Sequence, residues 1–277
     1  MVPLRLSNGF TEQREINLGP LLIFSWLRAR RRKRWRESPF PDSWSETLER
    51  NVSPFRELTN DVQDQLRQFI QVFIREKNWE GCGGFVVTDE VKVTISGWVG
   101  ILVLGRQPEY FDHVLSILVY PSAYRAPVKI PTGGGVILEG QSSREGEAWY
   151  RGPVILSWSD VIADSRDRHR GNHLVLHEFA HQLDMQDGHQ TNGIPPMPWS
   201  QRELWERVMD KAYLEHCHQC DYGQNWLDPY GATNPQEFFA VMTEAFFEAP
   251  DVVMLEAPDV FDQFRTFYNI DPRSVQP

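Results

Sequence analysis

The sequence is poor in cysteine and has no long apolar run. Its 277 residues include only three cysteines, Cys82, Cys217 and Cys220. A disulfide-held secreted protein would use more, so we expect a reducing compartment and a cytoplasmic protein. The apolar stretch from Leu21 to Leu27 is far shorter than the roughly 20 residues that span a bilayer. The sequence therefore predicts no transmembrane helix here.

An excess of positive charge is also missing from the chain as a whole. The net charge is −10, which argues against nucleic acid as the main partner of the folded body. Residues 28–36 nevertheless hold seven of the 28 Lys and Arg residues. We consider two hypotheses for residues 1–42. They form a solvated, flexible basic arm with a linker, or residues 21–36 make a peripheral contact with the inner membrane face.

The folded domain is expected to span residues 43–277. Apolar residues at spacings of three and four predict an amphipathic helix at residues 59–77. Short β-branched runs predict strands at residues 82–87, 91–95, 99–104, 114–120 and 154–158. Later periodic segments predict helices at residues 171–184, 200–217, 234–249 and 258–268. This order is typical of an α+β fold with a small mixed sheet followed by a mainly helical half.

A metal-binding motif lies in the first of these later helices. Residues 177–181 read His-Glu-Phe-Ala-His. Positions i and i+4 of a helix share a face, so His177 and His181 can bind one ion. Zinc is the expected ion, because it suits imidazole and carboxylate ligands, and Glu178 is the candidate general base. The alternative is a helix with two core histidines that bind backbone or carboxylate groups.

A catalytic zinc site needs a third protein ligand. No histidine lies six residues after His181, which argues against the extended metzincin pattern. The predicted helix at residues 234–249 is capped by Asn234 and carries Glu237 in its first turn, so Glu237 is our candidate ligand. Glu244 lies on the same face seven residues later. It either orients a zinc-bound imidazole or faces solvent.

Three further residues flank these candidates. Tyr230 precedes Glu237 by seven residues on a turn, where it could donate to an oxyanion or serve only in packing. His173 is expected at the surface or beside a zinc-bound imidazole. Asp184 is expected to orient a zinc histidine, to cap the helix end or to bind a loop amide.

Taken together, three segments resemble the Mlc titration factor A family, bacterial zinc peptidases of the gluzincin type. The segments are His173–Asp184, Tyr230–Val241 and Thr243–Pro250, and the resemblance runs from about Ser43 to the C-terminus. The Tyr and Glu arrangement is also similar to that of the catalytic domain of anthrax lethal factor. The chain differs from the enteric family member in its basic arm and in a longer glycine-rich segment at residues 131–140.

The resemblance implies a zincin-like metallopeptidase domain with one catalytic Zn²⁺. It implies His177, His181 and Glu237 as metal ligands, Glu178 as general base and Tyr230 as oxyanion donor. It further implies aminopeptidase-type activity on a peptide or protein substrate, by means of a metal-activated water. A transcriptional repressor is the other implied partner, and a regulatory protein that sequesters it, with catalysis secondary, is the alternative function.

Zinc peptidases of this kind often bind the substrate backbone along an edge strand before the motif helix. The predicted strand at residues 154–158 is the candidate here, by strand addition. Proline at Leu156 is then expected to reduce peptide turnover more than zinc affinity.

Overall fold

The chain forms two compact units, residues 1–38 and 39–277. The computed structural model describes residues 19–106, 109–122, 152–166, 171–186 and 191–275, so the glycine-rich segment at 131–140 lies outside it. The first unit contains the helix α1 (Gly19–Arg36), where one hypothesis expected a flexible arm. No helix in these described ranges has the length and apolar content needed to cross a bilayer.

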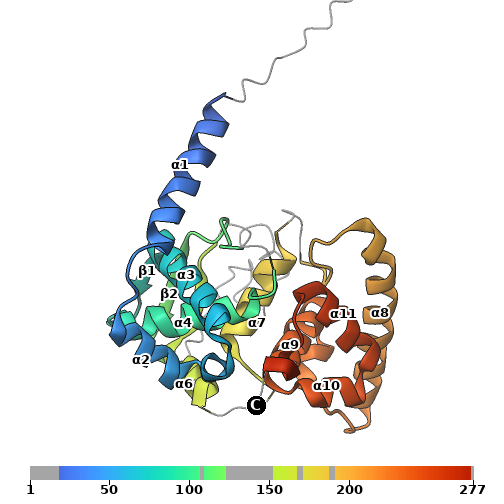
Figure 1. Cartoon of the computed structure of the whole chain (residues 1–277). Helices are drawn as coiled ribbons and strands as arrows, with labels where there is room; N and C mark the ends of the chain where they lie inside the picture. The colour runs from blue at the N-terminus through green and yellow to red at the C-terminus, as the bar shows by residue number, and fades with distance from the viewer. Residues whose placement is uncertain (1–18, 107–108, 123–151, 167–170, 187–190, 276–277) are drawn as a thin grey trace, which may run out of the picture. The chain divides into compact units, whose positions relative to one another are not determined.

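Helices dominate the second unit (Figure 1). Its α-helices are α2 (Asp42–Asn51), α3 (Asn60–Glu76), α4 (Asp89–Leu102), α6 (Trp158–Arg166), α7 (Leu174–Asp184), α8 (Trp199–Asp221), α9 (Pro235–Glu248), α10 (Pro250–Glu256) and α11 (Pro258–Tyr268). Its 3-10 helices are η1 (Ser53–Glu57), η2 (Pro229–Ala232) and η3 (Pro272–Val275). The predicted helices at 59–77, 171–184, 200–217, 234–249 and 258–268 are confirmed within a few residues.

One small parallel sheet accompanies the helices. Its strands are β1 (Asn78–Gly81), β2 (Ser116–Tyr120) and β3 (Val154–Ser157), in that spatial order. Both pairings are parallel, so the expected mixed sheet is corrected. Parallel strands need a crossover of a dozen or more residues, and α4 lies in the connection between β1 and β2. The strands predicted at 114–120 and 154–158 are confirmed.

The prediction for residues 82–104 is wrong. The runs at 91–95 and 99–104, which were expected to be strands, fall mainly in the single buried helix α4, and residues 82–87 follow β1 without strand structure. A fully buried helix has no polar face, so its sequence cannot be distinguished from buried strands by periodicity. Gly97 and Gly100 allow close packing, because a Cβ atom there would lie 2.7 Å from Val52 and 2.2 Å from Leu66.

The helix α7 lies at the centre of the second unit, between α4 and α9 (Figure 1). Its inner face is anchored by Phe179, whose ring centre lies 5.8 Å from that of Phe73 and 5.0 Å from that of Phe111. Because these rings come from α3 and from the loop before β2, the same apolar cluster fixes α7 to the N-terminal half of the unit.

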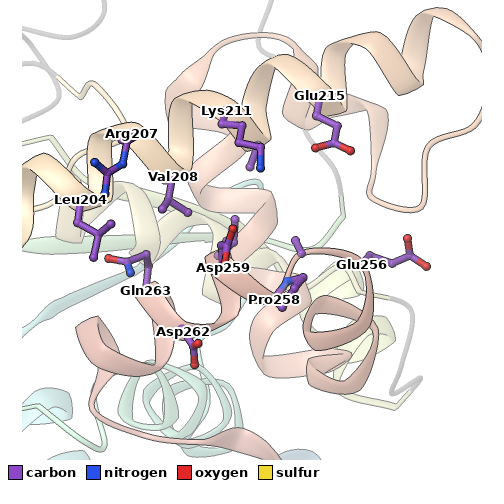
Figure 2. Close-up of a pocket in the computed structure, with 13 residues that line it drawn as sticks. Leu204, Arg207, Val208, Lys211, Glu215, Glu256, Pro258, Asp259, Asp262 and Gln263 are labelled. Atoms are coloured by element: carbon purple, nitrogen blue, oxygen red, sulfur yellow. The ribbon is translucent and has the colours of Figure 1, made fainter.

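The C-terminal helices have an aromatic core of their own. The ring of Trp205 on α8 stacks on Phe264 of α11 with centres 5.3 Å apart. Beside this core, a groove of about 600 Å³ lies between α8 and the start of α11 (Figure 2). Arg207 and Lys211 are among the residues of α8 that line it. The groove contains no residue of the His-Glu-x-x-His motif, so it is separate from the site described next.

Candidate metal centre

Acidic residues of two other helices fix the start of α7. The backbone amide of Leu174 donates to Asp164 of α6 at 2.9 Å, and the amide of His173 donates to Glu244 of α9. The first amides of a helix have no partner within the helix and need one outside it. Both carboxylates supply that partner, so they set where α7 begins and how its motif face is oriented.

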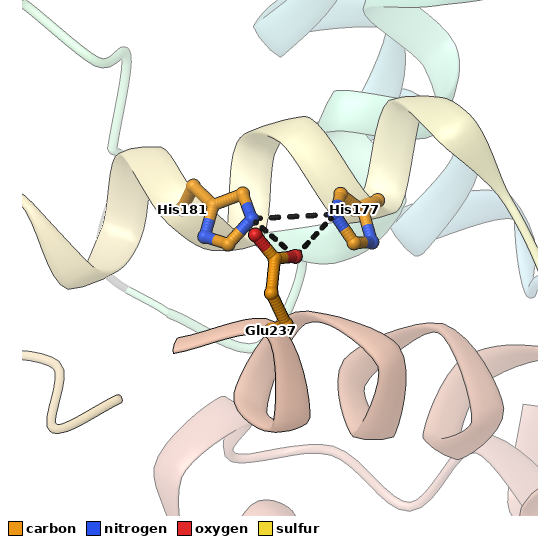
Figure 3. A group of neighbouring side chains, drawn as sticks. All are labelled: His177, His181 and Glu237. Carbon is orange, nitrogen blue, oxygen red and sulfur yellow. Dashed lines mark hydrogen bonds and ion pairs between the residues drawn. The ribbon is translucent and has the colours of Figure 1, made fainter. Parts of the chain in front are cut away.

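Three side chains meet beside α7 (Figure 3). The Nε2 atoms of His177 and His181 lie 3.2 Å apart. The Oε2 atom of Glu237 lies 3.1 Å from the former and 3.3 Å from the latter. Each of the three side chains keeps 15% of its surface exposed. The structure thus brings the three predicted ligands to one point that solvent and a substrate can reach.

This triangle of two nitrogens and one oxygen fits a zinc ion. A point equidistant from atoms at these separations lies about 1.9 Å from each, and a small displacement from their plane gives the 2.0–2.1 Å that zinc adopts with imidazole. Two imidazoles and one carboxylate also match the donor set of catalytic zinc sites, which leave a fourth position open. The residues present therefore fit the ion that the family implies.

The first turn of α9 places Glu237. Asn234 caps the helix, and its Oδ1 atom accepts a hydrogen bond from the amide of Glu237 at 2.9 Å. Pro235 occupies the first helical position, where its missing N–H costs nothing. The cap was predicted from the sequence, and the cap and the proline together present the carboxylate toward α7.

A loop after α7 holds the same end of α9. The Oδ2 atom of Asp184 accepts hydrogen bonds from the amides of Asn192 and Gly193, at 2.9 and 2.8 Å. Gly193 has a positive φ of 76°, and a Cβ atom there would lie only 2.5 Å from the carbonyl oxygen of Pro235. Asp184 therefore binds loop amides, one of the alternatives left open, and supports Glu237 through the loop.

Glu244 binds the imidazole of His177 directly. Its Oε1 atom accepts a hydrogen bond from Nδ1 of His177 at 2.7 Å, and its Oε2 atom accepts the amide of His173. The side chain is buried, so the solvent-facing alternative is wrong. Because the Nδ1 proton is held by Glu244, the lone pair of Nε2 is directed at the cluster.

The candidate base and the two histidines lie on one helix. Glu178 is half-buried, and its charge interacts with His177, His181 and Glu237. Burial raises its pKa, while the charges of the histidines oppose that rise. A carboxylate with a raised pKa takes up a proton more readily than a surface glutamate, which suits a general base.

Tyr230 borders the cluster from η2. Its ring centre lies 6.0 Å from that of His177, and 41% of its surface is exposed. Its amide donates to Oδ1 of Asp228 at 2.8 Å, and Oδ2 of Asp228 accepts from Asn172 at 2.9 Å. Asp228 therefore ties the turn that carries Tyr230 to the residues just before α7.

The cluster has strongly perturbed acid–base properties without a metal. Burial disfavours the charge on His177, but hydrogen bonds to Glu237 and Glu244 outweigh it and raise the pKa to about 10. Burial alone would raise the pKa of Glu237, whereas its hydrogen bonds with His177 and His181 lower it to about 2. These contacts favour a proton on His177, and a cation that binds at Nε2 would have to displace it.

His173 was predicted to lie at the surface or beside a zinc-bound imidazole, and its side chain does neither. Its ring is fully buried, 4.0 Å from that of Trp98 between centres, and burial lowers its pKa to about 3. The supporting contacts of Asp164, Asp228 and Asn172 were not predicted at all. They join residues 10 and 56 positions apart, and nothing in the spacing of these common surface residue types marks such pairs.

Comparison with known proteins assigns the family. The sequence model described as Glucose-regulated metallo-peptidase M90 matches residues 26–269. The chain belongs to this M90 family. An uncharacterized protein of Synechocystis sp., slr2042, is 33% identical over 246 residues, which cover 86% of this chain and 89% of the relative. Proteins named Mlc titration factor A from Yersinia pestis and Yersinia pseudotuberculosis are 31% identical over 233 residues, 83% of this chain and 84% of theirs.

The M90 assignment confirms the family resemblance expected from the motif segments. It also agrees with the His-His-Glu cluster. Among the residues that the structure describes, His177, His181 and Glu237 are the one group of histidine, cysteine and acidic side chains placed to hold a metal ion. The chain is therefore a metallopeptidase-like protein with a mixed α and β fold.

Proposed function

We propose that this M90 chain is a zinc-dependent peptidase with a zincin-like domain at residues 43–277. The observation that carries the proposal is the convergence of the His177, His181 and Glu237 ligand atoms within 4.8 Å, beside a half-buried Glu178. The alternative from the sequence is two core histidines bonded only to carboxylates. That alternative would not require a candidate general base, Glu178, and a tyrosine, Tyr230, beside the solvent-accessible cluster. Bound zinc would supply Lewis acidity toward water and a peptide carbonyl.

The chain's own residues would perform the remaining chemistry. Glu178 accepts the proton of the attacking water and returns it to the leaving amine. The hydroxyl of Tyr230 donates to the oxygen that becomes negatively charged as the peptide carbonyl is attacked. Glu244 holds His177 in one tautomer and orientation throughout.

The strand β3 is the proposed docking edge for the peptide backbone. Within the described residues it pairs with β2 on one side only, and it directly precedes α6 and α7. Leu156 is buried, so a proline there would damage the core as well as the edge. Ile155, which is 38% exposed, is the better site for that substitution.

Substitution of Glu178 by Gln tests the proposal. The purified protein is expected to hold about one zinc ion per chain, because zinc sites of this kind bind a single ion. The Glu178→Gln variant should retain zinc and lose peptide turnover by a factor of about 100 or more, as expected for a general base. Glu203→Gln, on the exposed face of α8, is the control and should change neither. Absence of zinc from the parent protein would refute the proposal.

Aminopeptidase-type activity and a cytoplasmic location complete the proposal. The cysteines are free in the structure, which agrees with a reducing compartment. Turnover of peptides with a free amino terminus but not of the same peptides acetylated would support an aminopeptidase. Equal turnover of both would indicate an endopeptidase.

A regulatory role is the second candidate. Relatives at 31% identity are named Mlc titration factor A, which suggests that the chain sequesters an Mlc-type transcriptional repressor. Titration calorimetry with the purified repressor tests this idea with the parent chain and with Glu178→Gln. Binding by both, without turnover by the parent, would favour regulation over catalysis. Turnover without repressor binding would remove the regulatory role.

A further inference from the structure

The helix α1 separates apolar and basic residues along its axis. Residues 21–27 are apolar apart from Ser25, whereas residues 28–36 hold seven basic residues. Phe24, Trp26 and Leu27 expose 69%, 57% and 48% of their surface. Large apolar side chains that are exposed together on one short segment mark an interaction site.

The helix has no apolar face along its length. Successive residues of an α-helix are turned by about 100°, so the five consecutive basic residues at 30–34 point to all sides. They form a basic collar around the helix, and Phe24, Trp26 and Leu27 likewise point to different sides of its other end. A helix that lies flat on a membrane instead places its apolar residues on one side. The distribution in α1 therefore excludes flat binding.

We propose that α1 enters an anionic bilayer obliquely, with its apolar end first. At 1.5 Å per residue the apolar end is about 10 Å long, which matches the depth of roughly 5–10 Å at which interfacial helices sit. The basic collar then lies among the lipid phosphates, which attract Lys and Arg. The apolar end is far shorter than the roughly 20 residues that span a bilayer, so the helix enters without crossing it.

The apolar end favours lipid over nucleic acid as the partner. Phosphates of either kind would attract the collar equally. A bilayer gives the exposed Phe24, Trp26 and Leu27 an apolar environment, and the tryptophan suits the headgroup boundary in particular. The rest of the chain is acidic, with −17 left after the seven basic residues of 28–36 are set aside, so the collar and not the folded body is the part that meets the anionic surface.

Vesicle binding by the full-length chain tests the proposal. We expect co-sedimentation with phosphatidylcholine vesicles that contain about one-third phosphatidylglycerol, and at least about tenfold weaker binding to phosphatidylcholine alone. Combined substitution Phe24→Ser, Trp26→Ser and Leu27→Ser keeps every charge and should weaken binding by about tenfold or more. Unchanged binding of this variant would overturn the proposal, because the contact would then be electrostatic only.

A matched control removes exposed apolar residues elsewhere. This control combines three substitutions of exposed residues on α8: Trp199→Ser, Leu204→Ser and Leu214→Ser. This control should bind vesicles as the parent does, and thermal unfolding should show that both triple variants are folded. Tighter binding of the parent to single-stranded RNA than to the anionic vesicles would overturn the lipid assignment in favour of nucleic acid.

Two fluorescent probes test the oblique entry. An environment-sensitive dye is attached at Ser25→Cys or at Lys33→Cys, in chains whose native cysteines are replaced by serine. A blue shift on vesicle addition is expected at position 25 and not at position 33. Equal shifts would show a helix that lies flat, and no shift at either position would show that α1 stays in water. Either result would overturn oblique insertion.

Discussion

Removal of the Glu244 carboxylate should weaken zinc binding and destabilise the protein together. This side chain accepts the Nδ1 proton of His177 and the backbone amide of His173. Glu244→Ala removes both acceptors from a buried position. The imidazole of His177 is then free to rotate or to change tautomer, and the start of α7 loses one of its two external partners.

The size of each effect follows from these contacts. A buried donor left without its partner costs about 1–3 kcal/mol, and Glu244→Ala leaves two such donors, although water that enters the space reduces the sum. Loss of the group that orients a metal-bound histidine typically lowers metal affinity 10- to 100-fold, which corresponds to about 1.4–2.8 kcal/mol. Glu244→Gln keeps one acceptor oxygen for the two donors, so its effects should be smaller.

Two measurements separate orientation from general loss of stability. Zinc affinity is measured by competition with a chelating dye, and the free energy of unfolding is measured on the metal-free protein. The control is Thr243→Val on the same helix, which removes a buried hydrogen bond of 2.8 Å to Tyr268. The control should lower stability and leave zinc affinity unchanged. If Glu244→Ala binds zinc as tightly as the parent while losing similar stability, the orientation argument is refuted.

Two further predictions concern pH and backbone conformation. His177 has a pKa raised from 6.5 to about 10, so it should stabilise the metal-free fold below pH 6.5 and lose this contribution as pH rises toward 10, which unfolding of the metal-free protein at several pH values checks. Zinc affinity should rise with pH over the same interval, which chelator competition from pH 6.5 to 8.5 checks. A pH-independent affinity would contradict the protonated state. Gly193→Ala should lower the free energy of unfolding by about 1–3 kcal/mol, because φ is positive and the added Cβ atom would lie 2.5 Å from the carbonyl oxygen of Pro235. Gly223→Ala, where φ is positive but the space is open, should lower it less, and thermal unfolding checks both.

The parts of the site that could be predicted are those that depend on residues close together in the sequence. His177 and His181 are four residues apart, and the cap at Asn234 fixes where α9 begins and hence the position of Glu237. A helix converts such spacings into one geometry, so a few residues were sufficient to place both histidines on one face of α7 and Glu237 in the first turn of α9, whereas the contact between the two helices is given by the structure alone. The contact between Glu244 and His177 followed less certainly, since spacing shows which face a residue shares but not what covers that face.

The main error in the predicted fold concerns a buried helix. The helix α4 is buried on every side after its first turn, so its β-branched residues predicted strands. Its actual form depends on α2 and α3, which pack against Gly97 and Gly100. Those contacts come from residues 30 to 50 positions earlier and exist only after the chain has collapsed. A single sequence contains no signal for them, whereas the amphipathic helix α3 was predicted from its own pattern.

The supporting network explains how such distant segments can form one precise site. Asp164 and Glu244 hold the start of α7, Asp184 holds the loop against α9, and Asp228 holds the turn of Tyr230. In each case a carboxylate accepts one or more backbone amides, so the contact fixes the course of the main chain beside the cluster. An ion bound by His177, His181 and Glu237 would add to the stability of this network by an amount set by its free concentration and affinity.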